Sequence, residues 1–214
     1  MDEEIRKMIE RFDGLIDEEA ADMLVREKRG ELKWKKIEEL EEGKAWLYAK
    51  VENVVEKNIT MAVVGDETGH CILKIWEGDY GIKEGDVIKI VNAWVKNGMR
   101  GREINVGKYG KIEKADVKIE TKIEFGIKKG LFNIRGKINR IYPTQVYLGN
   151  KERFIRKVVV DGHEIFLMNE RAREMKKFSE NDEIIILWLH ERNGRIYGDE
   201  VSKIHAGEMR YDAE

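Results

Sequence analysis

The residues best suited to bind a ligand lie on two neighbouring segments of alternating character, 59–65 and 71–76. These segments meet at the turn Asp66-Glu67-Thr68-Gly69. In the second segment, the two-residue period of a strand places Lys74 and Trp76 on the same face. A positive charge suits a phosphate and a flat ring suits a base, so this pairing favours binding of a single nucleic-acid strand.

Other aromatic and basic side chains fall on the same predicted face. If Val91, Ala93 and Val95 point inward, Trp94 and Lys96 point outward. A tryptophan at the end of a strand also often closes the mouth of a barrel, so packing is the alternative role for both tryptophans. The complete set of candidate nucleic-acid-binding residues in the first half of the chain is Tyr48, Lys50, Lys74, Trp76, Trp94, Lys96, Arg100 and Arg102.

No arrangement of residues predicts catalysis. The four histidines are scattered, and none lies in a metal-binding pattern such as HExxH. The glycine-rich segment 107–111 lacks phosphate-loop spacing, and no nucleophile has a neighbouring base. The single cysteine, Cys71, excludes an internal disulfide, and its strand context predicts a buried apolar side chain. We therefore expect a protein that is not an enzyme and needs no metal or other cofactor.

The segments that position these residues are mostly strands. Alternation predicts strands at 44–55, 59–65, 71–76, 86–96 and 103–113. Five strands in about 75 residues, with a glycine-rich link between the third and fourth, suit a small Greek-key barrel of the OB type. Helical spacing over 3–29 predicts two short helices, the second capped by Asp17. These helices are interpreted as a small appendage or, alternatively, as a module that docks a partner.

The strand pattern recurs in the second half, which indicates an internal repeat. Four features appear twice in the same order: Gly43 and Gly130, VVGD at 63–66 and VVVD at 158–161, Asp86 and Asp182, and Lys111-Ile112 and Lys203-Ile204. The second unit adds a predicted helix over 169–182, capped by Asn169, and a type I′ hairpin turn at Asn193-Gly194. The fold prediction is mainly β, with two tandem five-stranded OB-fold barrels after a short helical segment. The predicted limits are 1–30 for the helices, 31–115 for the first barrel and 116–214 for the second, joined by an ordered strand near 114–128.

The composition bounds the class of protein. Hydrophobic residues make up 42% of the chain, which excludes general disorder, and no apolar run is long enough to span a membrane. The charged first residues contain no apolar signal core, so we expect an intracellular, cytoplasmic protein. Charged residues reach 38% with a single glutamine, a thermophile-like signature. The net charge of −2 argues against a protein that coats duplex DNA, but a stacking-based single-strand binder needs only local positive charge.

Four motifs resemble archaeal replication protein A, the single-stranded DNA-binding protein of replication and repair. They are the D-E-T-G turn at 66–69, the strand end L-K-I-W at 73–76, G-D-V-I at 85–88 and N-V-G-K-Y-G-K-I at 105–112; GLIDEEAADMLV at 14–25 is also similar to helical pieces of that family. The resemblance implies a base-stacking role for Trp76 and phosphate contacts for Lys50 and Lys96. The position of the family's second stacking aromatic falls on Glu103, which leaves Trp94 as a substitute or a weaker site.

The second barrel departs further from that pattern. Its third strand ends at Met168 rather than at an aromatic residue. Its candidate nucleic-acid-binding residues are Arg156, Phe166, Arg192 and Arg195. It is interpreted as a weak DNA-binding barrel or as an assembly module.

We therefore expect non-sequence-specific binding of single-stranded DNA in replication, repair or recombination, with no membrane association. Other replication protein A subunits or replication proteins are the further partners that the resemblance implies. One alternative is a scaffold subunit whose barrels bind protein partners, which the near-neutral charge favours. A second alternative is RNA binding, because no residue distinguishes a 2′-hydroxyl.

Overall fold

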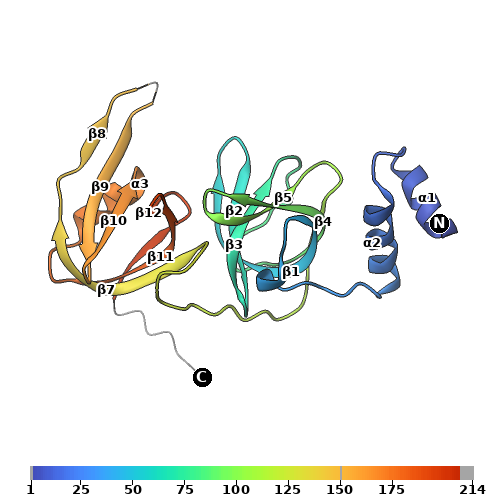
Figure 1. The fold of residues 1–214 in the computed structure, drawn as a ribbon, viewed down its shortest axis with the longest axis horizontal. Coiled ribbons are helices and arrows are strands. Elements are labelled where there is room, and N and C mark those ends of the chain that lie inside the picture. The colour runs from blue at the N-terminus through green and yellow to red at the C-terminus, as the bar shows by residue number, and fades with distance from the viewer. Residues whose placement is uncertain (1, 150, 208–214) are drawn as a thin grey trace. The chain divides into compact units, whose positions relative to one another are not determined.

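The computed structural model describes residues 2–149 and 151–207. Its contacts divide the chain into two compact units: Met1–Gly98 with Arg102–Lys122, and Met99–Gly101 with Ile123–Glu214. Each unit contains one closed β-barrel, and two helices precede the first barrel (Figure 1). The predicted mainly β fold, two tandem OB-type barrels after a short helical segment, is confirmed.

The two N-terminal helices form as predicted. They are α1 (Glu3–Arg11) and α2 (Glu18–Arg29). Asp17 caps α2, because its Oδ1 accepts a hydrogen bond from the backbone N–H of Ala20 at 2.8 Å. Gly30 ends α2 in the left-handed conformation that glycine adopts without strain.

The second of these helices packs onto the barrel of its own unit. An apolar cluster joins α2 residues such as Ala21 and Leu24 to Val91 of the barrel. Beside it, Glu27 accepts a hydrogen bond from Lys89 Nζ at 2.7 Å. Hydrogen bonds to Glu113 and Glu27 raise the pKa of Lys89, so its positive charge is held at this contact.

The first barrel closes with the strand order of an OB fold. Its sheet runs β1-β2-β3-β5-β4, and β4 pairs back onto β1. The two parallel neighbours are β3 and β5, while the hairpins are antiparallel. Inward-facing residues such as Leu47, Leu73 and Ile90 fill a continuous core. The strands are β1 (Gly43–Glu56), β2 (Thr60–Asp66), β3 (Gly69–Ile75), β4 (Val87–Gly98), β5 (Gly101–Val106) and β6 (Lys111–Lys114).

The second barrel repeats this order. Its sheet runs β10-β12-β11-β7-β9, closed by pairing of β9 with β10. The short β8 extends the loop between the first two strands and pairs with β9. The elements are β7 (Phe132–Ile141), β8 (Gln145–Tyr147), β9 (Arg153–Val160), β10 (His163–Met168), α3 (Glu170–Glu174), β11 (Glu183–Arg192), β12 (Arg195–Gly198) and β13 (Lys203–Ala206).

The repeated sequence features occupy matching places in the two barrels. Asp86 Oδ2 accepts a hydrogen bond from the backbone N–H of Lys83, and Asp182 Oδ2 accepts one from Ser179, both at 2.7 Å. Each aspartate ends the turn that enters the fourth strand. Lys111-Ile112 and Lys203-Ile204 likewise lie on β6 and β13, which pair with β4 and β11. The internal repeat is therefore confirmed in the fold.

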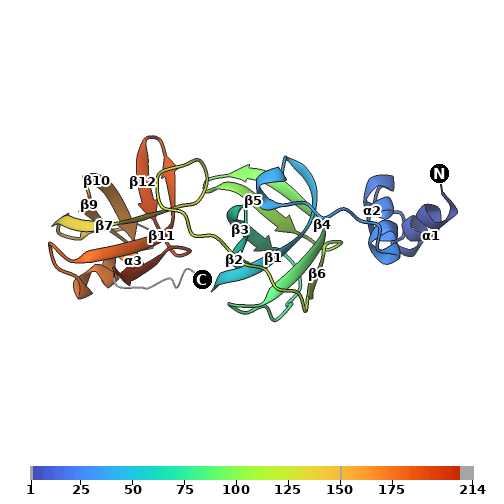
Figure 2. The ribbon, with the colours of Figure 1, turned by 90° about the horizontal axis from the view of Figure 1, so that it is seen from below.

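Three local predictions are wrong. The expected fifth strand, 103–113, is two strands, β5 and β6, separated by a turn in which the N–H of Gly110 donates to the carbonyl of Gly107. The expected strand near 114–128 has no strand partner between 115 and 124 (Figure 2), and Phe125 and Gly126 form isolated bridges with Asn133. The expected helix over 169–182 shortens to α3 plus one 3₁₀ turn, Met175–Lys177.

The expected cap of that third helix is also wrong. Asn169 makes no side-chain hydrogen bond to the helix, and its Oδ1 instead accepts from the backbone N–H of Phe154 at 3.2 Å. By contrast, the predicted type I′ turn is present, because Asn193 and Gly194 both have positive φ.

Candidate nucleic-acid interface

The first barrel presents two exposed tryptophans on one outer face. In β3, Leu73 and Ile75 are buried, and Trp76, directly after the strand, is exposed as predicted; Ile72 at an alternate position is buried, contrary to the simple alternation. Trp76 is 55% exposed and Trp94 is 47% exposed, which is unusual for the largest apolar side chain. Both line one open cavity of about 360 Å³, here called the first-barrel pocket, whose lining is Trp76, Trp94, Lys96, Asn105 and Gly107.

Asn105 holds this pocket together. Its Oδ1 accepts a hydrogen bond from Trp76 Nε1 at 2.9 Å, and its Nδ2 donates to the carbonyl of Trp94 at 3.3 Å. The amide therefore fixes the orientation of the Trp76 ring and ties it to β4. Sequence analysis did not single out Asn105, although it begins the N-V-G-K-Y-G motif.

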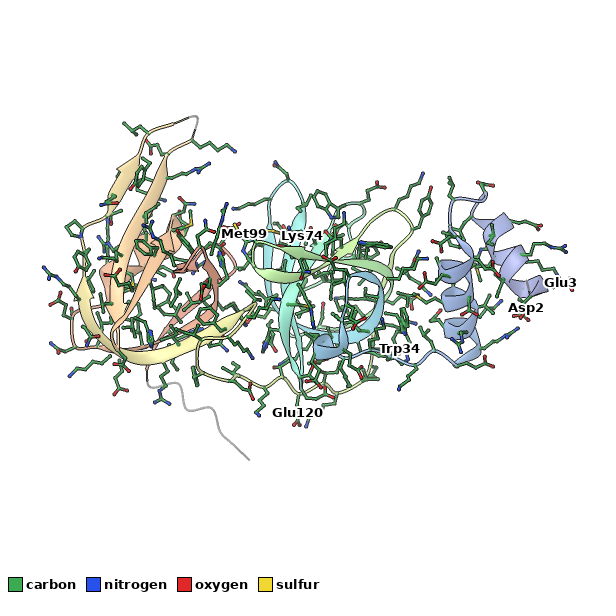
Figure 3. The ribbon with its side chains drawn as sticks, viewed as in Figure 1. Asp2, Glu3, Trp34, Lys74, Met99 and Glu120 are labelled. Atoms are coloured by element: carbon green, nitrogen blue, oxygen red, sulfur yellow. The ribbon has the colours of Figure 1, made fainter. Side chains whose placement is uncertain are left out.

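The predicted cations of this face differ in their availability. Lys96 is exposed and makes no ion pair with any described residue. Lys74, labelled in Figure 3, donates to the carboxylate of Glu103 at 2.5 Å. The Glu103 side chain is only 7% exposed, so it neutralises Lys74 at close range. One predicted phosphate contact is thus engaged within the barrel.

Tyr48 and Lys50 do not line the first-barrel pocket. The Tyr48 ring lies 4.4 Å from that of Trp34, which Figure 3 labels on the connection between α2 and the barrel. Lys50 lies 3.4 Å from the Glu52 carboxylate. Both residues lie on β1. The contact of Tyr48 is ring packing, and the contact of Lys50 is an ion pair with a neighbour on the same strand.

The two arginines of the hairpin between β4 and β5 are also held by other groups. Arg102 donates to the backbone carbonyls of Ile37 and Glu38, at 3.2 and 2.9 Å. Arg100, which belongs by its contacts to the second unit, is 7% exposed and donates twice to Asp199 Oδ2. A guanidinium buried in this way cannot reach a strand without losing its carboxylate partner.

The second barrel carries a cavity of its own on the matching strands. In β10, Ile165 and Leu167 are buried, so Phe166 faces outward, where the Arg195 guanidinium lies 5.5 Å from its ring centre. The cavity has a volume of about 390 Å³ and is here called the second-barrel pocket. Its lining is Tyr142, Pro143, Gln145, Ile155, Lys157, Glu164, Phe166, Gly194 and Arg195.

The remaining two candidates of the second barrel lie outside this pocket. Arg156 alternates with the outward-facing Lys157, and its Nε donates to Thr144 Oγ1 at 2.7 Å. Arg192 contacts Met99 through its Nη1. The structure thus brings together Phe166 and Arg195, and it adds Tyr142, which sequence analysis did not identify. The available signal was a tyrosine directly before the single proline, Pro143.

Within 2–149 and 151–207, no group of three or more histidine, cysteine or acidic residues is placed to hold a metal ion. Cys71 is buried, as predicted, and burial raises the pKa of its thiol. Among the described helices, none has the length and apolar character required to cross a membrane.

Comparison with known proteins gives one similarity in sequence. No protein-family model matches the chain. The single-stranded DNA-binding protein Ssb of Saccharolobus solfataricus is 43% identical over 60 residues. This chain is similar in sequence to an archaeal single-stranded DNA-binding protein. The match covers 28% of this chain and 40% of the length of the relative. It confirms the resemblance inferred from the motifs.

Solved structures give more distant similarities. A replication protein A heterotrimer bound to single-stranded DNA is 13% identical, with a TM-score of 0.44 over 80% of this chain and 51% of that one. Pot1pC of Schizosaccharomyces pombe bound to single-stranded DNA is 18% identical, with a TM-score of 0.37 over 40% and 88%. A murine DNA-binding protein bound with double-stranded DNA is 14% identical, with a TM-score of 0.43 over 74% and 93%.

Proposed function

We propose that this protein binds single-stranded DNA without sequence specificity, as a non-enzymatic cytoplasmic protein of replication, repair or recombination. The observation that carries the proposal is the first-barrel pocket, where two exposed tryptophans share one outer face with Lys96, which has no ion pair among the described residues. The Saccharolobus relative is a single-stranded DNA-binding protein, which supports the same proposal.

The pocket binds a strand through two kinds of contact. The faces of Trp76 and Trp94 stack on successive bases, and each stacked base contributes about 1–3 kcal/mol whatever its identity. Lys96 neutralises a phosphate at the edge of the same pocket. Because every base has an aromatic face, this arrangement needs no base-specific hydrogen bond and tolerates any sequence.

The hydrogen bond to Asn105 prepares Trp76 for this role. A ring whose Nε1 is already satisfied loses less conformational freedom when a base stacks on it. Asn105 is therefore a positioning residue in the proposal, and the tryptophans make the contact with DNA.

A second candidate function is that of a scaffold subunit for other replication proteins. The observation that favours it is the engagement of Lys74 by Glu103 and of Arg100 by Asp199, which leaves few cations for phosphates. This function predicts tight association with a protein partner and little affinity for DNA. RNA binding is the third candidate, and competition between matched DNA and RNA oligomers distinguishes it.

The test is a fluorescence titration of the full chain with a thymidine 30-mer at low and at high salt. We expect tryptophan quenching that weakens with salt, and Trp76→Ala should weaken binding by about 1–3 kcal/mol. The control is Trp34→Phe, which removes one tryptophan outside the first-barrel pocket and should leave the affinity unchanged. Absence of binding at low salt would favour the scaffold function instead.

A further inference from the structure

The second-barrel pocket differs from the first in having polar walls. Its volume of about 390 Å³ is in the range of small-molecule sites. It lies where β9 and β10 meet the β8 segment and the turn between β11 and β12. In an OB fold the second and third strands form the usual binding surface, so the location suits a ligand.

Two aromatic rings and two cations shape the walls. Phe166 lies opposite Lys157 in the antiparallel ladder, and the Tyr197 ring lies beside the Phe166 ring, with the two ring centres 5.7 Å apart. On the other wall, Lys157 Nζ lies 4.3 Å from the centre of the Tyr142 ring. The rings suit the flat faces of a base, while Arg195 suits a phosphate.

A carboxylate stands inside this otherwise basic pocket. Glu164 Oε1 accepts a hydrogen bond from Lys157 Nζ at 2.8 Å, and this bond raises the pKa of Lys157. The Glu164 side chain is 56% exposed, and its Oε2 has no hydrogen-bond donor among the described residues. An ionised carboxylate only accepts hydrogen bonds, so this oxygen discriminates between donors and acceptors on a ligand.

We propose that the second-barrel pocket takes one base of a single DNA strand and prefers bases with an exocyclic amine, cytosine above all, to thymine. The inference rests on the proposed function, which brings the strand to the protein. The N4 amine of cytosine donates to Glu164 Oε2 while the ring stacks on Phe166. Thymine presents a carbonyl oxygen at the same position, and two acceptors facing each other repel.

The pocket therefore adds a base preference to a protein whose other barrel has none. A strand held without discrimination by Trp76 and Trp94 is read at one position by Glu164. A hydrogen bond to a charged group contributes enough to give a preference of about tenfold.

The experiment compares the affinity of the full chain for a cytidine 15-mer and a thymidine 15-mer at pH 7.5, by fluorescence anisotropy. We expect about tenfold tighter binding of the cytidine oligomer. Glu164→Gln should bring the ratio close to one, because an amide no longer selects a donor. Phe166→Ala should reduce the ratio as well, by removing the ring on which the base stacks.

The matched control is Glu170→Gln, which makes the same charge change at an exposed residue outside the pocket. It should keep the full cytidine preference. A ratio of one in the unmodified protein, or a tenfold ratio that survives Glu164→Gln, would overturn the inference while leaving the proposed function intact. Failure of both oligomers to bind at low salt would contradict the proposed function itself.

Discussion

The two barrels share a strand order but present different outer faces. In the parallel ladder of the first barrel, Lys74 lies beside Asn105, and in the second Phe166 lies beside Tyr197. The first barrel has one exposed ring directly after β3, that of Trp76, and a second within β4, that of Trp94. The second places an aromatic pair in the middle of the face and surrounds it with charge.

The difference shows that a shared backbone fold does not determine what the outer face of a barrel can bind. Both barrels contain the same aspartate turn before the fourth strand and the same added strand after the fifth. Substitutions on one face of two strands convert an open stacking surface into a walled polar pocket. Function therefore has to be argued from the side chains of each barrel separately.

The largest expected effect tests which barrel dominates affinity. In the proposal two bases stack on Trp76 and Trp94. Substitution of both by alanine should therefore weaken the binding free energy for a thymidine oligomer by about 2–6 kcal/mol. The matched double substitution of Tyr142 and Phe166 by alanine should weaken the binding free energy for the same oligomer by less than about 1 kcal/mol, because the second-barrel pocket disfavours thymine. Anisotropy titrations at one salt concentration measure both, and equal losses would remove the distinction between the barrels.

A smaller effect tests whether Glu103 neutralises Lys74 on the outer face of the first barrel. Glu103→Gln keeps the shape of the side chain but removes its charge, so Lys74 becomes available to a phosphate. One added phosphate contact should steepen the slope of log affinity against log salt by about 0.7. Glu113→Gln is the control, since Glu113 pairs with Lys89 and does not line the pocket. An identical slope in all three proteins would exclude Lys74 from the interface.

The smallest effect concerns stability and is specific to the second barrel. His190 is buried and lies 5.9 Å from Tyr197, which in turn supports Phe166. Burial lowers the pKa of His190, against the opposing influence of the nearby Asp199. As the pH falls, His190 of the unfolded chain becomes protonated near the ordinary histidine pKa of about 6.5, whereas His190 of the folded chain becomes protonated only at a lower pH. The contribution of neutral His190 to the free energy of unfolding is therefore fully present above that pH and is lost as the pH falls below it.

The unfolding temperature should therefore fall between pH 7.5 and 5.5, and His190→Gln should make this fall shallower. The measurement is thermal unfolding followed by circular dichroism. His163→Gln serves as the control, because His163 is exposed on β10. The same pH dependence in both variants would show that protonation of His190 does not contribute to the fall in stability.

Much of the fold follows from the sequence because period-two alternation and turn chemistry are local. Parity predicts the outward direction of Trp76 and Trp94, which are 55% and 47% exposed. It does not hold along the whole strands, because Ile72 shares the parity of Trp76 and is buried, and Val91 packs in the cluster with α2 rather than in the barrel core. The repeat was visible because Asp86 and Asp182 each fix the same turn. The predicted strand near 114–128 failed because alternation shows which side chains would share a face, but not whether a sheet edge is available to pair with.

The candidate sites were less predictable because their contacts are distant in the sequence. Lys74 and Glu103 are 29 residues apart, and Arg100 and Asp199 are 99 apart, so neither ion pair has a local signal. Asn105 and Tyr142 acquire their places only when strands and loops come together in the barrels. Sequence reasoning therefore identified Trp76, Trp94 and Phe166 as residues of the pockets but missed Tyr142. It also did not foresee that Lys74 and Arg100 are paired with carboxylates.

The most direct test of the central claim is to locate bound DNA on the unmodified protein. A thymidine oligomer that contains photoreactive bromouracil is cross-linked to the full chain, and the modified peptides are identified by mass spectrometry. Our account predicts that the cross-links concentrate on Trp76 and Trp94. Cross-links confined to the second barrel, or none at low salt, would contradict it.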